Sequence, residues 1–200
     1  MEQTPKSDIT RQRILTTGRA LVLKDGFGGV GLSSILRESG VPKGSFYYYF
    51  ASKEAFGCAL LDDYVADYLA RVDTLAASPG TAGDKLANFW ASWFNDAESG
   101  GIASRCLVVK LAAEIADLSD DMRRILDAGV AELTGRIADL LRQGATDGSV
   151  CALTDPDTAA KVLYAQWLGA AILSKLTQGD LPLRRALDDT TRRLSPISTA

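Results

Sequence analysis

The chain has 200 residues, of which 46% are hydrophobic and 24% are charged, and its formal net charge is −3. This composition is typical of a soluble globular protein. No run approaches 18 apolar residues and the N-terminus lacks the apolar stretch of a signal peptide, so we expect a cytoplasmic protein without a membrane segment.

Positive charge gathers near the N-terminus. Residues 1–55 carry eight Lys or Arg and five Asp or Glu, a net charge of +3, whereas residues 56–200 carry 14 and 20, a net charge of −6. A surface that binds phosphates needs such a local excess of cations. The distribution therefore favours DNA binding by the first quarter of the chain, with an acidic remainder held off the duplex.

Three helices are predicted within the first 51 residues. Apolar residues recur at helical spacing in the first helix, and Gly26 ends it. The second runs from a Ser cap at Ser33 to Gly40. A short turn and a third, very short helix follow. This order of elements is the helix-turn-helix plan of DNA-binding proteins.

The third helix carries three consecutive tyrosines between two phenylalanines. Phe46 and Phe50 lie one turn apart and are expected to anchor inward. Three phenol hydroxyls suit a core poorly, since each buried one needs a partner. The residues expected in the DNA major groove are therefore Lys43, Gly44, Ser45, Tyr47 and Tyr48, with Lys43 as the best candidate for contact with guanine. The residues expected at phosphates are Ser33, Tyr49 and Lys53.

Three segments of this region, Gly31–Ile35, Gly40–Tyr47 and Tyr49–Glu54, resemble the DNA-binding domain of the TetR family of one-component repressors. The resemblance spans about residues 9–60. It implies an all-α, TetR-like fold, with a helix-turn-helix domain at residues 1–51 and a helical effector-sensing and dimerisation domain at residues 52–200. It also implies a transcriptional repressor that binds double-stranded DNA.

Beyond residue 52 the chain is predicted to be helical nearly throughout, with about nine helices in all. Ser52 caps a connecting helix over residues 52–77, Ser119 caps a later one, and Asp155 precedes a Pro at a first helical position. After the connecting helix, five helices are expected, near 83–98, 104–117, 119–143, 155–177 and 182–193. No strand, internal repeat or low-complexity segment is predicted.

Residues 159–173 are apolar nearly all round, which predicts a helix buried on more than one side. Small residues at 165, 169 and 170 would let a partner helix approach closely. Together with the last helix, this segment resembles the pair that forms the four-helix dimer interface of TetR-type repressors. An internal core helix is the alternative. A homodimer suits a helix-turn-helix protein, which usually reads two half-sites of a near-palindromic operator.

The chain has no His, which removes His-based catalysis and the usual zinc and iron sites. Its cysteines, Cys58, Cys106 and Cys151, are far apart and form no Cys-x-x-Cys motif. We expect Cys58 to be a buried structural thiol and Cys151 to be exposed. No metal, no cofactor and no enzymatic activity are predicted, and a helical enzyme or scaffold is the distant alternative.

Cys106 is the candidate reactive thiol. It is expected in the first turn of a helix capped by Ser104, where free N–H groups and the helix dipole favour the thiolate. Arg105 and Lys110 would add positive charge. The alternative is a small side chain packed in the core.

Residues 105–123 and 162–170 resemble the TetR branch that includes the N-ethylmaleimide- and hypochlorite-responsive repressor of electrophile detoxification, and related acrylate-responsive regulators. This resemblance implies that Cys106 is the sensor. It also implies that Lys175 can stabilise the thiolate or condense with an oxidised sulfur. From its position alone, at the end of an apolar helix, Lys175 is an ordinary surface lysine.

Two kinds of inducer stay open. One is a small-molecule electrophile or oxidant that acts covalently at Cys106. The other is a reversible ligand, such as an unsaturated acid, whose carboxylate would meet Arg105, Lys110 or Lys175. The pocket expected for this second ligand is lined by Phe89, Trp90, Trp93, Phe94 and Trp167.

Overall fold

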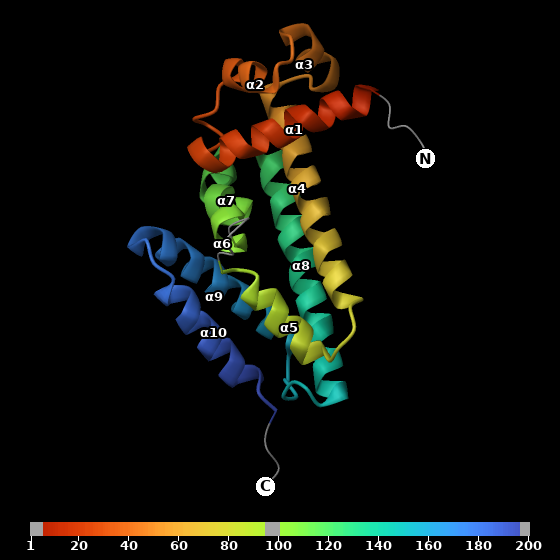
Figure 1. Ribbon diagram of the computed structural model, residues 1–200, viewed down its shortest axis with the longest axis vertical. Helices are drawn as coiled ribbons and strands as arrows, with labels where there is room; N and C mark the ends of the chain where they lie inside the picture. Colours follow the sequence, from red (N-terminus) through yellow and green to blue (C-terminus); the bar gives the residue numbers. More distant parts are fainter. Residues whose placement is uncertain (1–5, 95–100, 197–200) are drawn as a thin grey trace. The chain divides into compact units, whose positions relative to one another are not determined.

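The computed structural model describes residues 6–94 and 101–196, which form ten helices and no strand (Figure 1). The predicted all-α fold is confirmed. In chain order the helices are α1 (Lys6–Asp25), α2 (Leu32–Ser39), α3 (Lys43–Tyr49), α4 (Lys53–Ala76), α5 (Ala82–Ala91), α6 (Ile102–Arg105), α7 (Leu107–Leu118), α8 (Asp120–Asp147), α9 (Pro156–Thr177) and α10 (Leu181–Leu194). None of the helices within the described ranges combines the length and apolarity needed to cross a membrane.

The extra helix arises at Cys106. The segment predicted as one helix over 104–117 is divided into α6 and α7, because Cys106 has an extended backbone, with φ −71° and ψ 116°. The helix predicted over 83–98 ends earlier, at Ala91, and residues 95–98 of that prediction lie outside the described residues.

The chain divides into two compact units. The N-terminal unit comprises Met1–Asp67 and Lys110–Ala128, and the C-terminal unit comprises Tyr68–Val109 and Gly129–Ala200. The chain passes between them within α4, α7 and α8. The boundary that we expect at residues 51–52 on sequence grounds stays a prediction.

The helix-turn-helix lies in the N-terminal unit. Gly40 ends α2 in the left-handed conformation, with φ 64°, which glycine adopts at little cost. Pro42 precedes α3, and its carbonyl accepts the N–H groups of Ser45 and Phe46. The predicted Ser33 cap is wrong: the N-cap of α2 is Gly31, two residues earlier, and it makes no side-chain cap hydrogen bond. At α4 the predicted cap is present, since the Ala55 N–H donates to Ser52 Oγ at 3.0 Å.

Aromatic side chains hold α3 in place. Phe46 and Phe56 have no exposed surface and Phe50 is 3% exposed. Their ring centroids lie 5.3–5.7 Å apart, which suits tilted and edge-to-face packing. Gly18 of α1 faces this cluster, because a Cβ there would lie 2.2 Å from the Phe56 ring. The inward anchors of the short helix are therefore Phe46 and Phe50, as their spacing predicts.

In the C-terminal unit, α9 and α10 pack side by side (Figure 1). The indole N–H of Trp167 donates to Thr190 Oγ1 at 3.0 Å, and the Gln166 amide donates to Asp189 at 3.0 Å. Large apolar side chains nevertheless stay exposed along this pair: Val162, Ile172, Leu173, Leu176 and Leu181. Of the small residues, Ala170 is buried within the chain, whereas Ala165 is exposed.

Candidate functional site

One face of α3 is open to solvent. Tyr48 is 78% exposed and Tyr47 48% exposed, and both follow the buried Phe46. Lys43 and Gly44 are also exposed, while Ser45 and Tyr49 are partly covered. The structure thus brings the predicted groove-contacting residues onto one short helix, with the aromatic anchors beneath them.

The predicted phosphate contacts have different surroundings. Ser33 is exposed near the start of α2. Lys53 is half-buried, and its Nζ donates to the Phe27 carbonyl at 2.9 Å and lies 4.7 Å from the centre of the Phe27 ring. Lys53 therefore already ties the start of α4 to the segment between α1 and α2. Its phosphate contact stays a prediction.

A residue that sequence reasoning missed, Glu114 of α7, contacts the same segment. Its carboxylate accepts the backbone N–H groups of Phe27, at 3.2 Å, and Gly28, at 2.5 Å. Lys110, one turn earlier on α7, donates from Nζ to the Lys24 carbonyl at 3.1 Å. These partners lie 86 or 87 positions apart in the chain, and no local pattern marks such long-range pairs.

Cys106 lies at a helix N-terminus, but not where it was predicted. The expected cap, Ser104, lies within α6 and donates its hydroxyl to the carbonyl of Gly101, the residue before this helix, at 2.8 Å. Cys106 itself precedes α7, and its Sγ accepts the N–H of Val109 at 3.5 Å. A sulfur that receives the N–H of the third helical residue occupies the N-cap position. The correction is thus from a first-turn residue to the cap.

The thiol is enclosed. Cys106 is 2% exposed, and Tyr68 of α4 is 7% exposed. Burial raises the pKa of the Tyr68 phenol above its ordinary value of 10.0, and a negative charge on Cys106 raises it further. The two side chains are therefore electrostatic neighbours, and Tyr68 stays a neutral phenol beside the sulfur at physiological pH.

The three cations predicted near the thiol come from α6, α7 and α9. Arg105 is exposed at the end of α6. Lys110 is half-buried and directed at Lys24, as described above. Lys175 is exposed near the end of α9. Their effect on the sulfur stays a prediction.

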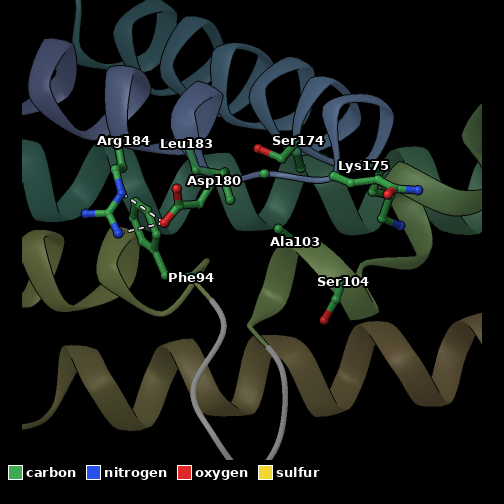
Figure 2. Close-up of a pocket in the computed structure, with 11 residues that line it drawn as sticks. Phe94, Ala103, Ser104, Ser174, Lys175, Asp180, Leu183 and Arg184 are labelled. Atoms are coloured by element: carbon green, nitrogen blue, oxygen red, sulfur yellow. Dashed lines mark hydrogen bonds and ion pairs between the residues drawn. The ribbon is translucent and has the colours of Figure 1, made fainter.

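A cavity of about 480 Å³ brings Lys175 close to α6 (Figure 2). Ala103 and Ser104 line it on one side, and residues of α9 and α10 line it on the other. Arg184 and Asp180 also line it and form an ion pair, with 2.6 Å between Arg184 Nη2 and Asp180 Oδ2. The hydroxyl of Ser174 is buried and has no hydrogen-bond partner among the described residues. This cavity can hold a small polar molecule within a few residues of Cys106.

The aromatic residues predicted to line a pocket are mostly packed against one another. Trp90, Trp93 and Trp167 are at most 1% exposed. Trp90 and Trp167 stack with centroids 4.9 Å apart, and Trp93 lies 5.6 Å from Trp167. Phe89 is 3% exposed, and only Phe94 of the set lines the cavity. An open ligand pocket among these rings stays a prediction that requires them to separate.

The other two thiols differ from Cys106. Cys58 is half-buried rather than buried as predicted. Partial burial raises the pKa of its thiol, and the charges of Asp121, Glu54 and Asp62 raise it further, so its thiolate is disfavoured. Cys151 is half-buried rather than exposed as expected, because its Sγ donates to the Arg193 carbonyl at 2.9 Å. Within the described parts of the chain, no group of three or more His, Cys, Asp or Glu residues could hold a metal ion.

Two family models match the chain. The one for bacterial regulatory proteins of the tetR family matches residues 14–56, and the one for a tetracyclin repressor-like C-terminal domain matches residues 82–189. The first coincides with the helix-turn-helix, and the second with the helices that carry Cys106, the cavity and the α9–α10 pair.

Characterised proteins and solved structures agree with this match. The chain is 40% identical over 179 residues to the HTH-type transcriptional repressor NemR of Escherichia coli K12, which covers 89% of this chain and 90% of that protein. It is 32% identical over 181 residues to the transcriptional regulator AcuR of Cereibacter sphaeroides, with 90% and 82% covered. The crystal structure of the reduced form of E. coli NemR superposes with a TM-score of 0.88 at 37% identity, covering 96% of this chain and all of that one. The chain therefore belongs to the TetR family and is a TetR-type transcriptional repressor.

Proposed function

We propose that this repressor is released from its operator when electrophiles or oxidants modify Cys106. The observation that carries the proposal is the bond from the Val109 N–H to Cys106 Sγ. The sulfur is both the reactive atom and the cap of α7. Since the thiol is only 2% exposed, an adduct has no room beside it. Modification therefore has to displace α6 or the start of α7.

The first chemical step needs only the thiol, the reagent and water. With N-ethylmaleimide, Sγ bonds to one alkene carbon, the carbon–carbon π bond breaks, and the other carbon takes a proton from water. With hypochlorous acid, the sulfur gives two electrons to chlorine, and the products are a sulfenic acid, chloride and a proton. The Lys175 amine can then displace water from the sulfenic acid and form a sulfur–nitrogen bond. The cavity that holds Lys175 near α6 supports this last step.

The DNA contacts follow from the exposed face of α3. Lys43, Tyr47 and Tyr48 are proposed to read the major groove, with Gly44 and Ser45 allowing close approach. Tyr49, Ser33 and Lys53 are proposed at phosphates. TetR regulators act as dimers, and the exposed apolar residues of α9 and α10 support a dimer contact at that pair. A dimer suits a near-palindromic operator.

A reversible inducer is the second candidate. The cavity between α6 and α9–α10 favours it, because the unsatisfied Ser174 hydroxyl and the Lys175 ammonium could both bind a small unsaturated acid. In this case the thiol of Cys106 would not react, and induction would not depend on it. An inducer of this kind washes out without reductant, whereas a maleimide adduct does not.

The test is binding to the DNA upstream of the repressor's own gene, before and after a mild dose of N-ethylmaleimide or hypochlorite. We expect release of the native protein and of Cys58→Ser, but not of Cys106→Ser. Cys58→Ser is the matched control, because it removes a thiol that burial keeps protonated. Release of Cys106→Ser would overturn the covalent switch. If the native protein and Cys106→Ser both stay on the DNA, the reversible inducer is favoured, and it would be sought among small unsaturated acids.

A further inference from the structure

The segment between α1 and α2 is held by one carboxylate. Phe27 and Gly28 are consecutive residues outside any helix, so their N–H groups have no helical acceptor. Both donate to Glu114, one to each carboxylate oxygen. Bonds to an ionised acceptor are about twice as strong as neutral ones. Glu114 therefore fixes the direction of two successive peptide groups.

A second residue of α7 attaches to the same segment. Lys110 donates to the Lys24 carbonyl, at the end of α1. Lys110 and Glu114 are four residues apart, which places them on one face of the helix. On this face of α7, the ammonium of Lys110 binds a carbonyl that precedes Gly26, and the carboxylate of Glu114 binds two N–H groups that follow it.

The position of this segment matters for α3. Gly26 turns the chain with φ 80°, and α2 begins six residues later. Phe27 is 4% exposed and also receives the Lys53 ammonium on its carbonyl. Because α2 leads directly into the turn before α3, a shift of residues 26–28 changes where Tyr47 and Tyr48 are presented. Contacts in a DNA groove tolerate little such displacement.

We propose that Glu114 is a positioning residue for operator binding, and that α7 carries the state of Cys106 to the helix-turn-helix through it. The first part stands on the contacts of the N-terminal unit. The second part rests on the thiol switch proposed above. Cys106 caps α7, and Glu114 follows eight residues later on the same helix. Loss of the cap would therefore act on the helix that grips the α1–α2 segment.

A substitution at Gly28 allows the contact with Glu114 to be disrupted without changing Glu114 itself. A Cβ at Gly28 would lie 2.9 Å from Glu114 Oε1, so Gly28→Ala must push the carboxylate away. Its φ is not positive, and alanine fits the backbone there. Two independent substitutions thus remove the same interaction.

The first experiment measures operator affinity of the purified full-length proteins. Glu114→Ala is expected to weaken binding about tenfold, as loss of a charge-assisted bond implies. Glu114→Gln keeps one acceptor oxygen and should lose less. Asp117→Asn is the control, since Asp117 is an exposed acid on the same helix and its change removes the same charge. Operator affinity of Glu114→Ala equal to that of the native protein would overturn the positioning role.

The double substitution separates positioning from general damage. Gly28→Ala alone should weaken operator binding, but it should add almost nothing in the Glu114→Ala background, because the carboxylate is already absent. Additive losses would show that the two residues act separately and would contradict the proposal. Gly28→Ala and Glu114→Gln also keep the test decisive if Glu114→Ala fails to fold.

The second experiment measures the ratio of operator affinities before and after N-ethylmaleimide. In the native protein this ratio should be large. In Glu114→Ala it should be closer to one, because the affinity before treatment is already low and α7 no longer contacts the α1–α2 segment through Glu114. An unchanged ratio in Glu114→Ala would remove Glu114 from the coupling. If the native protein itself shows no release, the thiol switch fails, while the affinity experiment still decides the positioning role.

Discussion

The N–H of Val109 donates to the Sγ of Cys106 over 3.5 Å, so a thiol holds the first turn of α7. Serine is a good N-cap residue, and alanine cannot cap at all. Cys106→Ser should therefore unfold near the native midpoint, whereas Cys106→Ala should be less stable by about 1 kcal/mol. Urea unfolding followed by circular dichroism measures the difference. Equal stability of the two variants would mean that the sulfur contributes nothing as a cap.

The bond between Trp167 and Thr190 joins α9 to α10 at a buried point. Thr190→Val keeps the shape of the side chain but leaves the indole N–H without an acceptor, which should cost about 1–3 kcal/mol of unfolding free energy. Thr191→Val, at the next and exposed position, should cost less than about 0.5 kcal/mol. Urea unfolding of the two variants compares the loss of a buried hydroxyl that accepts a hydrogen bond with the loss of an exposed hydroxyl. Similar losses would contradict the assignment.

The two faces of α3 should respond differently to truncation. Phe46→Ala empties a fully buried site and should destabilise the protein by about 3–5 kcal/mol. Tyr48→Ala removes a largely exposed ring and should leave the melting temperature unchanged while weakening operator binding. Thermal unfolding and DNA titration of the same samples give both values. A Tyr48→Ala protein with native operator affinity would exclude Tyr48 from the groove.

Acid should weaken the contact between α5 and the end of α8. The Asp147 carboxylate accepts the Ala82 N–H at 2.8 Å and the Ser149 N–H at 2.9 Å, and these bonds, with that from the Ser149 hydroxyl, hold its pKa below the ordinary 3.8. The folded-state pKa is thus lower than the unfolded one. The stability that the Asp147 carboxylate contributes is fully present above about pH 3.8 and is lost as the pH falls through its folded-state pKa.

Asp147→Asn tests this sign. The variant should be less stable than the native protein at pH 7. This difference in the free energy of unfolding should become smaller as the pH falls below the pKa of Asp147 in the unfolded chain. Urea midpoints measured between neutral and acid pH reveal the trend. A gap that widens in acid would reverse the assignment.

The exposed apolar face of α9 and α10 should carry the dimer. Leu176 is 75% exposed, and a charge there would be desolvated in an interface. Leu176→Glu should shift the protein from dimer to monomer in sedimentation velocity. Leu118→Glu, at a leucine of α7 that is 54% exposed, is the control and should leave the dimer intact. A dimeric Leu176→Glu protein would place the interface elsewhere.

The local parts of the fold were predictable from sequence, because they depend on short-range chemistry. The turn at Gly40, the anchors Phe46 and Phe50, and the cap at Ser52 all follow from neighbours within one helical turn. Ser33 was the exception, because a Ser near a helix start does not fix which residue begins the helix.

The candidate site was less predictable, because it depends on distant pairs. The sequence predicted a helix capped by Ser104 with Cys106 in its first turn, but the division into α6 and α7 comes from the extended backbone at Cys106. Trp90 and Trp167 are 77 positions apart, and aromatic composition alone cannot distinguish a lined pocket from a stack. Glu114 has no sequence signature, since its partners are backbone groups that any residue could supply.

All three tryptophans of the chain, at 90, 93 and 167, are packed together in the C-terminal unit. The N-terminal unit contains tyrosines but no tryptophan. Intrinsic indole emission is therefore a built-in reporter of one half of the molecule, free of signal from the helix-turn-helix. Red-shifted or quenched emission on treatment with an inducer would register a change around the α5–α9 stack, even when no operator is present.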